Sequence, residues 1–201
     1  MIRLFGMVAL AVTFLGFTSS ANAAFLSFST PLSGAAESPP NASPATGFSQ
    51  VDLDTVTHTM RVRVVFASLQ GLTTTAHIHA PTPTPGTGVS GVATTTPVFA
   101  GFPLGVSSGT FDNTLDMTLD SSYNSSFVTA NGGTTATAEA ALFAAIIQGR
   151  AYMNVHSSAF PGGEIRGFFQ PLAVQSLPAP PGVIALGLGL FGLVASRRRA
   201  A

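Results

Sequence analysis

Cysteine and lysine are both absent from the 201 residues of this chain, and charged residues make up only 8% of it, against about a quarter in typical soluble domains. Without cysteine, the chain has no disulfide, no thiol nucleophile and no thiolate metal ligand. Stability must therefore come from a hydrophobic core or from bound ligands. Serine, threonine, alanine and glycine are abundant instead, which is typical of exported β-rich proteins whose solubility depends on hydroxyl groups.

The few charges are unevenly distributed along the chain. Of the eight arginines, Arg3 and residues 197–199 lie near the two termini. The middle of the chain keeps four arginines against all eight acidic residues, so its formal charge is −4. A negatively charged domain argues against nucleic acid as a partner.

The first 23 residues have the organisation of a secretory signal peptide. An early Arg3 precedes an apolar run from Leu4 to Phe17, and the small residues 21–23 form a cleavage site before Ala24. We therefore expect residues 1–23 to direct export through the inner membrane. The alternative is an uncleaved membrane anchor.

Residues 24–171 show the alternation of polar and apolar residues that β-strands require. Turn signals separate about seven such segments, which predicts an all-β fold, an antiparallel β-sandwich of the immunoglobulin-like or superoxide-dismutase-like kind. One short helix is expected at 136–148, because an apolar stripe is followed by Gly149 as a stop. The expected strands are 25–34, 48–53, 58–66, 77–79, 89–99, 109–119, 152–156 and 164–169.

Two of these strands have faces that can be assigned. In the strand at 58–66, an inward apolar row is expected: Met60, Val62, Val64 and Phe66. In the strand at 109–119, the exposed face can be assigned, because the alternation places the carboxylates of Asp112, Asp116 and Asp120 in one outward row. This row lacks the glycine and the terminal glutamate of a calcium loop, so it favours a solvated sheet face over an ion site.

Beyond Pro171 the composition changes again. Residues 172–181 form a proline-rich linker, and 182–195 is an uncharged run that precedes the arginines at 197–199. As a helix this run would span about 21 Å, against about 30 Å of hydrocarbon core, and it becomes long enough only when extended back to Leu177. We expect the segment 182–201 to hold the C-terminus in the inner membrane at least transiently, with its arginines on the cytoplasmic side.

Histidines occur at chemically suggestive spacings. His77 and His79 flank Ile78, so both imidazoles should project from one face of a strand with Cβ atoms about 7 Å apart, while Ile78 points into the core. This separation lets both rings converge on one ion at about 2.0–2.1 Å from each nitrogen.

The last predicted hairpin, residues 149–169, would supply further ligands. Its first strand places His156 on a polar face and its second begins with Glu164. We predict a copper or zinc site built from His77, His79 and His156, with Glu164 as the fourth ligand or as an outer partner. Because neutral imidazoles are required, its affinity should fall below about pH 6.5. Isolated His58 should not contribute.

A metal-free interpretation of the same residues remains open. The histidines could form a hydrogen-bonded network that joins two strands, with Arg166 paired to Glu164. The His-x-His arrangement is similar to the pattern of copper and zinc superoxide dismutases. The chain has neither that family's other ligands nor its disulfide, so the resemblance implies metal-binding capacity and not dismutation.

Five motifs occur along residues 24–171: Leu32-x-Gly34-x-x-Glu37-x-Pro39-Pro40, Ala45-Thr46-Gly47, Ala76-His77-Ile78-His79, the segment 151–156, and Pro161-Gly162-Gly163-Glu164-Ile165-Arg166-Gly167. Together they resemble the CHRD domain, the repeat described in chordin. The resemblance covers about 145 residues and implies an extracellular β-sandwich that is common in bacterial secreted proteins. Ser38 and a long proline-rich loop after His79 depart from the pattern.

The C-terminus resembles a PEP-CTERM sorting signal, which combines a proline motif, an apolar helix and an arginine cluster. Here Pro178-Ala179-Pro180 stands in place of the usual Pro-Glu-Pro. The resemblance implies an exosortase-type processing protease as a partner, and release to the cell surface, the extracellular matrix or the medium. A plain membrane anchor is the alternative.

Three classes of function are compatible with these features. The first is a surface or matrix module that binds a protein or a polysaccharide, and the second is a copper or zinc protein. The third, a hydrolase or redox enzyme, has little support, since there is no G-x-S-x-G motif and no serine in evident relation to a histidine and an acid. No catalytic residue is assigned.

Overall fold

The structure is a computed structural model that describes residues 25–172. The expected signal peptide, the linker beyond Leu172 and the expected membrane segment at 182–201 lie outside these residues. Within 25–172, no helix is long and apolar enough to cross a membrane.

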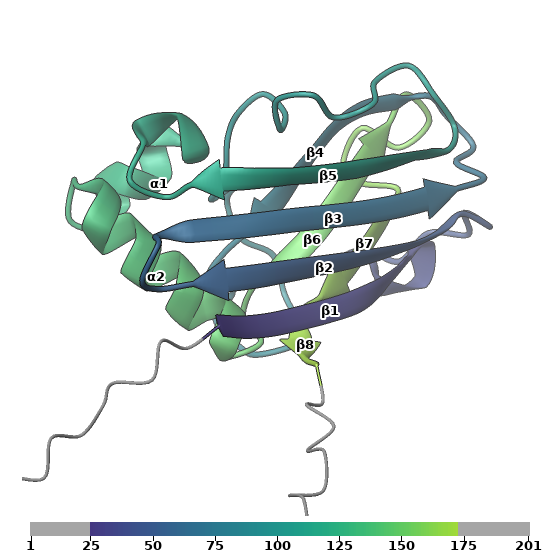
Figure 1. Cartoon of the computed structure of the whole chain (residues 1–201). Coiled ribbons are helices and arrows are strands. Elements are labelled where there is room, and N and C mark those ends of the chain that lie inside the picture. The colour runs from purple at the N-terminus through teal and green to yellow at the C-terminus, as the bar shows by residue number, and fades with distance from the viewer. Residues whose placement is uncertain (1–24, 173–201) are drawn as a thin grey trace, which may run out of the picture. The chain divides into compact units, whose positions relative to one another are not determined.

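Eight strands, two α-helices and two 3-10 helices make up the described part of the chain (Figure 1). In chain order these are β1 (Phe25–Ser33), η1 (Gly34–Ala36), β2 (Thr46–Asp54), β3 (Thr59–Ala67), β4 (Thr73–His79), β5 (Gly109–Asp116), η2 (Asp120–Ser122), α1 (Ser125–Ala130), α2 (Thr135–Ile147), β6 (Tyr152–Ser157), β7 (Ile165–Phe168) and β8 (Gln170–Pro171).

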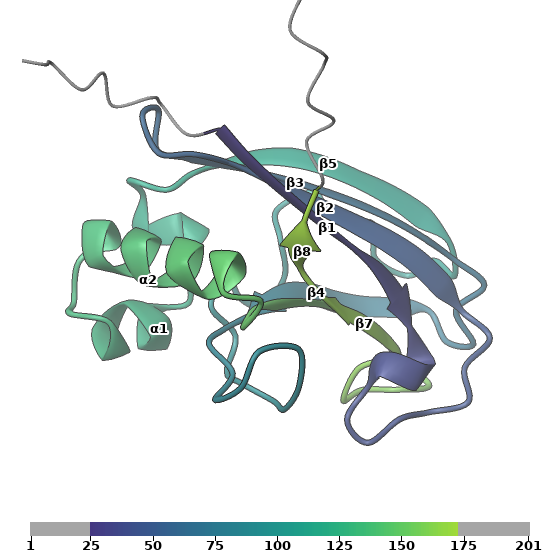
Figure 2. The same cartoon turned by 90° about the horizontal axis from the view of Figure 1, so that it is seen from below.

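The strands form one antiparallel sheet with the order β4-β6-β7-β1-β2-β3-β5, and β8 pairs with β1. The sheet curls, so that β4, β6 and β7 lie across from β2, β3 and β5 (Figures 1 and 2). The predicted all-β, sandwich-like fold is therefore confirmed. The curl is needed because both halves carry an apolar face that must be covered.

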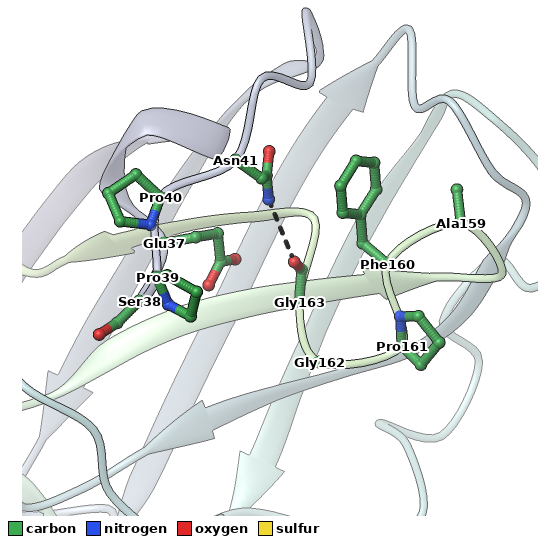
Figure 3. Close-up of a pocket in the computed structure, with 10 residues that line it drawn as sticks. All are labelled: Glu37, Ser38, Pro39, Pro40, Asn41, Ala159, Phe160, Pro161, Gly162 and Gly163. Atoms are coloured by element: carbon green, nitrogen blue, oxygen red, sulfur yellow. Dashed lines mark hydrogen bonds between the residues drawn. The ribbon is translucent and has the colours of Figure 1, made fainter.

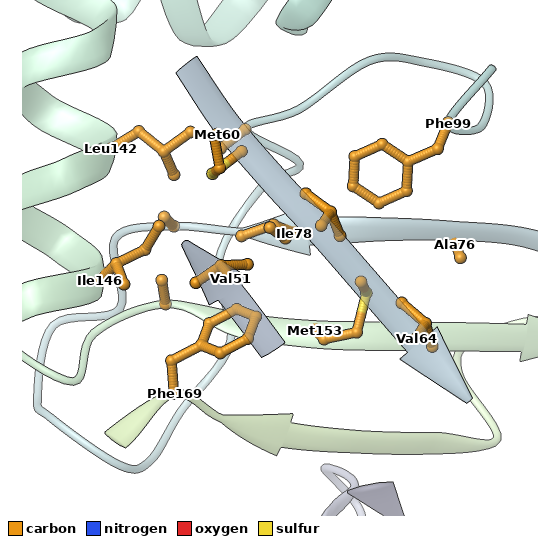
Figure 4. Close-up of a cluster of buried hydrophobic side chains, with 14 of the residues drawn as sticks. Val51, Met60, Val64, Ala76, Ile78, Phe99, Leu142, Ile146, Met153 and Phe169 are labelled. Carbon is orange, nitrogen blue, oxygen red and sulfur yellow. The ribbon is translucent and has the colours of Figure 1, made fainter. Parts of the chain in front are cut away.

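The core lies between the two halves of the sheet (Figure 4). The predicted inward row of β3 is buried, with at most 2% of any of its four residues exposed. Ile78 of β4 and Met153 of β6 enter the same core from the opposite half, and Leu142 and Ile146 of α2 close one end. The period-two alternation thus identified the core correctly on both sides.

Helix α2 matches the helix expected at 136–148. Its first turn is capped by Thr134, whose side chain accepts a hydrogen bond from Thr137 N, and Gly149 ends it with a φ of +66°. Helix α1 was not expected. It is only six residues long, and its one sequence signal is Asn124, which accepts a hydrogen bond from Ser126 N as an N-cap.

Two strand predictions were wrong in part. The segment 89–99 is a loop whose one bridge to a strand is His79↔Val92, because Pro97 and the glycines before it cannot sustain a ladder. The strand at 109–119 ends at Asp116, whose carboxylate accepts a hydrogen bond from Thr118 N and turns the chain. Leu119 is consequently 51% exposed, and Asp120 begins η2.

The last hairpin was expected to have one polar and one apolar face. All six residues of β6 are buried. The loops before β2 and after β4, and the turn before β7, contact the polar face. This covered face contains the histidines.

Candidate metal centre

His77 and His79 of β4 lie beside His156 of β6 because the two strands are hydrogen-bonded neighbours. In the register, His77 is opposite Asn154, and His156 is opposite Thr75, one position along the same face. Ile78 points the other way and is fully buried in the core. The sequence-based placement of His77 and His79 on one face is confirmed.

The three imidazole rings form a compact triangle. Their centroids are separated by 5.6 Å for His77–His156, 5.8 Å for His77–His79 and 6.1 Å for His79–His156. One ligand nitrogen from each ring lies within 4.8 Å of the others. His77 is 6% exposed and His156 is 8% exposed, so this triangle is largely shielded from solvent.

One nitrogen of each ring is bonded to a backbone carbonyl from a covering loop. His77 Nε2 donates to Pro97 O at 2.5 Å. His79 Nδ1 donates to Ser90 O at 2.9 Å, and His156 Nδ1 donates to Pro161 O at 3.0 Å. A carbonyl can only accept, so each of these nitrogens carries the proton, and the second nitrogen of the neutral ring holds a lone pair.

The three remaining nitrogens are His77 Nδ1, His79 Nε2 and His156 Nε2. All are buried without a hydrogen-bond partner among the described residues. A buried polar atom left unpaired costs about 1–3 kcal/mol, so three in one cluster require an explanation. Histidine ligands of metal ions characteristically donate their other nitrogen to a carbonyl or carboxylate, which is the pattern seen here.

Burial keeps the three rings neutral. It lowers the pKa of His77 and of His156 below the usual value, and lowers the pKa of His79 to about 4, although the carbonyl bonds act in the opposite direction. The neutral form is the one that binds a metal ion. Proton competition should thus begin at a lower pH than the value near 6.5 expected from free histidine.

In metal-free protein, we expect His79→Phe to gain stability relative to the wild type as the pH falls from 6.5 to about 4. Over this range the unfolded His79 binds a proton and the folded one does not, so the wild type loses up to about 3 kcal/mol of unfolding free energy. Phenylalanine binds no proton, so its contribution to stability does not change with pH. It can still stack on Tyr152, whose hydroxyl still donates to Ser90 O. Urea denaturation across this pH range measures the difference. A constant difference would contradict the neutral, buried state of His79.

An aromatic and cationic layer adjoins the triangle. Tyr152 stacks on His79 with a centroid distance of 4.8 Å and an interplanar angle of 4°. The Arg166 guanidinium carbon lies 4.9 Å from the centre of the Tyr152 ring. Arg166 is itself buried, and it donates to Gly88 O and to Ala36 O.

Glu164, predicted as the fourth ligand, does not join the triangle. Its fully buried carboxylate accepts hydrogen bonds from other groups: Ser43 Oγ at 2.6 Å, Gln70 N at 2.6 Å, Gly71 N at 3.5 Å and Ser157 Oγ. Burial alone would raise the pKa of Glu164, but these four bonds hold it below the usual value. Ser157 follows His156 along β6 and so points to the opposite face, which places Glu164 away from the imidazoles.

The expected ion pair between Arg166 and Glu164 was also wrong. Arg166 Nε instead lies 3.8 Å from Glu37 Oε2. Glu37 contributes to a pocket of about 300 Å³ between residues 37–41 and 159–163 (Figure 3). Burial raises the pKa of Glu37 to about 7, although the charge of Arg166 opposes this. Gly163 is required in this pocket, because its φ is +132° and a Cβ there would lie 2.8 Å from Glu37 Oε1.

His58 lies apart from the triangle, as expected. Its Nδ1 is 2.9 Å from Glu139 Oε2 of α2, a contact that the sequence did not indicate. Asp112 of the predicted exposed row pairs with Arg61 of β3.

Comparison with known proteins agrees with the motifs on these strands. A family model, the CHRD domain, matches residues 28–169, which include the three histidines, Glu37 and Glu164. No curated protein and no solved structure matches the chain.

Proposed function

Because the chain belongs to the CHRD domain family, we propose that it is an exported binding domain whose ligand is a copper or zinc ion held by His77, His79 and His156. One observation carries this proposal. Three buried imidazole nitrogens lack partners in one cluster, while the other nitrogen of each ring is fixed by a backbone carbonyl. Imidazole nitrogen is a ligand suited to both metals.

The alternative of a purely structural histidine network is less well supported. In a structural network that joins two strands, each buried polar atom should have a hydrogen-bond partner, because buried polar clusters with unpaired atoms destabilise a fold. Here the histidines bond outward to the loops and not to one another. The loops therefore orient the rings, and a bound ion would supply the missing partner for three atoms at once.

Titration of the metal-free protein tests this function. We expect one equivalent of copper or zinc to bind to the wild type, and the double variant His77→Ala/His79→Ala to lose at least about 100-fold in affinity, because two of three ligands are removed. His58→Gln removes a histidine outside the cluster and keeps a donor for Glu139, so it serves as the matched control. Isothermal calorimetry measures the affinity, and thermal melting verifies that each variant is folded.

Two results would contradict the metal function. One is unchanged binding in the double variant, and the other is wild-type binding no tighter than that of an unfolded control. Either result would favour the other expectation from the sequence, a module that binds a surface protein or polysaccharide.

Export and sorting complete the proposal. Residues 1–23 would direct secretion, and an exosortase-type protease would remove the segment 182–201 near Pro178-Ala179-Pro180, which releases the domain to the cell surface, the matrix or the medium. We expect the mature protein to begin at Ala24 and to lack residues 197–199. Intact-mass measurement of protein recovered from the surface or the medium determines the first and last residues of the mature chain. A surface species that keeps the three arginines would contradict the sorting step.

A further inference from the structure

The charge around the three histidines is unusual for a site that holds a divalent ion. All eight aspartate and glutamate side chains of the chain lie among the described residues, and none belongs to the triangle. Glu164 is held by four hydrogen-bond donors, and Glu37 faces Arg166. The others are Asp52 and Asp112, paired with arginines, Glu139, paired with His58, Asp54 and Asp116, which accept from their own turns, and exposed Asp120.

The fixed charge that acts on His79 from beyond the ligands is positive and belongs to Arg166, which has Glu37 as an ion-pair neighbour at 3.8 Å. Arg166 is 5% exposed, and only the Tyr152 ring connects it to His79. The ligand set itself is neutral. A divalent ion would therefore keep its full +2 charge in a buried place beside a cation. The hydration free energy of an ion scales with the square of its charge. On burial, a divalent ion therefore loses about four times as much hydration free energy as a monovalent ion of similar size.

The number of ligands also favours a monovalent ion. The unpartnered donors are Nδ1 of His77 and Nε2 of His79 and His156, and one ligand nitrogen from each ring lies within 4.8 Å of the others. Zinc prefers four tetrahedral ligands, so three histidines would leave its fourth position to a water molecule, and Cu(II) prefers a tetragonal set. Cu(I) has a filled d shell and a single charge, and three nitrogen donors can satisfy it. Imidazole binds all three ions, so charge and ligand number must decide between them.

We propose that the triangle of His77, His79 and His156 is a Cu(I) site that discriminates against Zn(II) and Cu(II). This inference rests on the proposed metal-binding function and specifies the ion. Selectivity arises from the absence of a carboxylate ligand and from the buried charge of Arg166.

Competition titrations of the metal-free protein test the selectivity. Cu(I) is supplied under anaerobic conditions with bathocuproine disulfonate as competitor, and Zn(II) and Cu(II) are titrated against chromophoric chelators. We expect one Cu(I) bound at least about 100-fold more tightly than either divalent ion, which corresponds to about 2.7 kcal/mol. Zn(II) or Cu(II) affinity equal to that of Cu(I) would overturn this inference and leave the metal function standing. Failure of all three ions to bind would reject both.

A charge variant tests the cause of the selectivity. Thr75 is half-buried on the same strand, and its Oγ1 is 2.9 Å from His77 Nε2. Thr75→Asp places a carboxylate beside the outer nitrogen of a ligand, and Thr75→Asn has the same shape without the charge. Relative to Thr75→Asn, we expect Thr75→Asp to raise Zn(II) affinity about tenfold more than Cu(I) affinity. Equal changes for the two ions would overturn the role of charge. If the Thr75 variants fail to fold, the wild-type titrations still decide the proposal.

Discussion

Replacing Val155 by aspartate is expected to unfold the domain under conditions in which the wild type is folded. Val155 lies in the middle of β6 and is fully buried among the apolar side chains of the core. A carboxylate placed there without a partner costs several kcal/mol or binds a proton instead. The loss is comparable with the roughly 5–15 kcal/mol by which domains are stable.

The control for this variant is Val65→Asp, which makes the same substitution in β3. Val65 is 52% exposed and alternates with buried Val64 and Phe66. The new carboxylate would be hydrated, so the unfolding free energy should change by no more than about 0.5 kcal/mol. Thermal melting compares the two proteins. Equal shifts in melting temperature would mean that the inward and outward faces of the sheet have been assigned wrongly.

The second large effect is expected at Glu164. Its side chain joins three separate segments, because its donors come from Ser43, from the backbone at Gln70 and Gly71, and from Ser157 of β6. Glu164→Ala leaves these donors without their acceptor and should lower the unfolding free energy by about 3–5 kcal/mol. Glu164→Gln keeps one acceptor oxygen, so a smaller loss of about 1.5–3 kcal/mol is expected.

Two measurements separate this structural role from the ligand role that the sequence suggested. Any Glu164 variant that folds should still bind one metal ion with the affinity of the wild type, because Glu164 does not join the histidines. Asp112→Asn, which removes an exposed ion pair with Arg61, should change stability little and is the control for loss of a carboxylate. Reduced metal affinity in folded Glu164→Gln would contradict the separation of the two sites.

The error concerning Glu164 has an identifiable cause. Strict alternation across a tight turn would place Glu164 on the face of His156. The chain between β6 and β7 is not a tight turn, since Ser157 N donates to Phe160 O and Gly163 has a φ of +132°. These departures move Glu164 to the face of Ser157. The sequence Pro161-Gly162-Gly163 indicates that the chain turns, but not by how many residues the alternation shifts.

The wrong strand at 89–99 and the missed α1 have a different origin. A run of β-branched residues favours an extended backbone, but a strand also needs a partner along its whole length. The segment from Val89 pairs with β4 through the single bridge His79↔Val92 and through a few backbone hydrogen bonds, such as Ala93 N to Ile78 O, and forms no continuous ladder. Six residues are too few for the amphipathic pattern that identified α2.

The sequence by itself determined which residues share a face. The apolar row of β3, the opposite directions of Ile78 and its two neighbouring histidines, and the helix that ends at Gly149 all follow from local periodicity, which depends only on backbone geometry. The tertiary structure alone decided what covers each face. The carbonyls of Pro97, Ser90 and Pro161 reach the imidazoles from loops whose paths follow no period, and they fix which nitrogen of each ring keeps its lone pair. Such contacts depend on how the whole chain packs, and no spacing of residues encodes them.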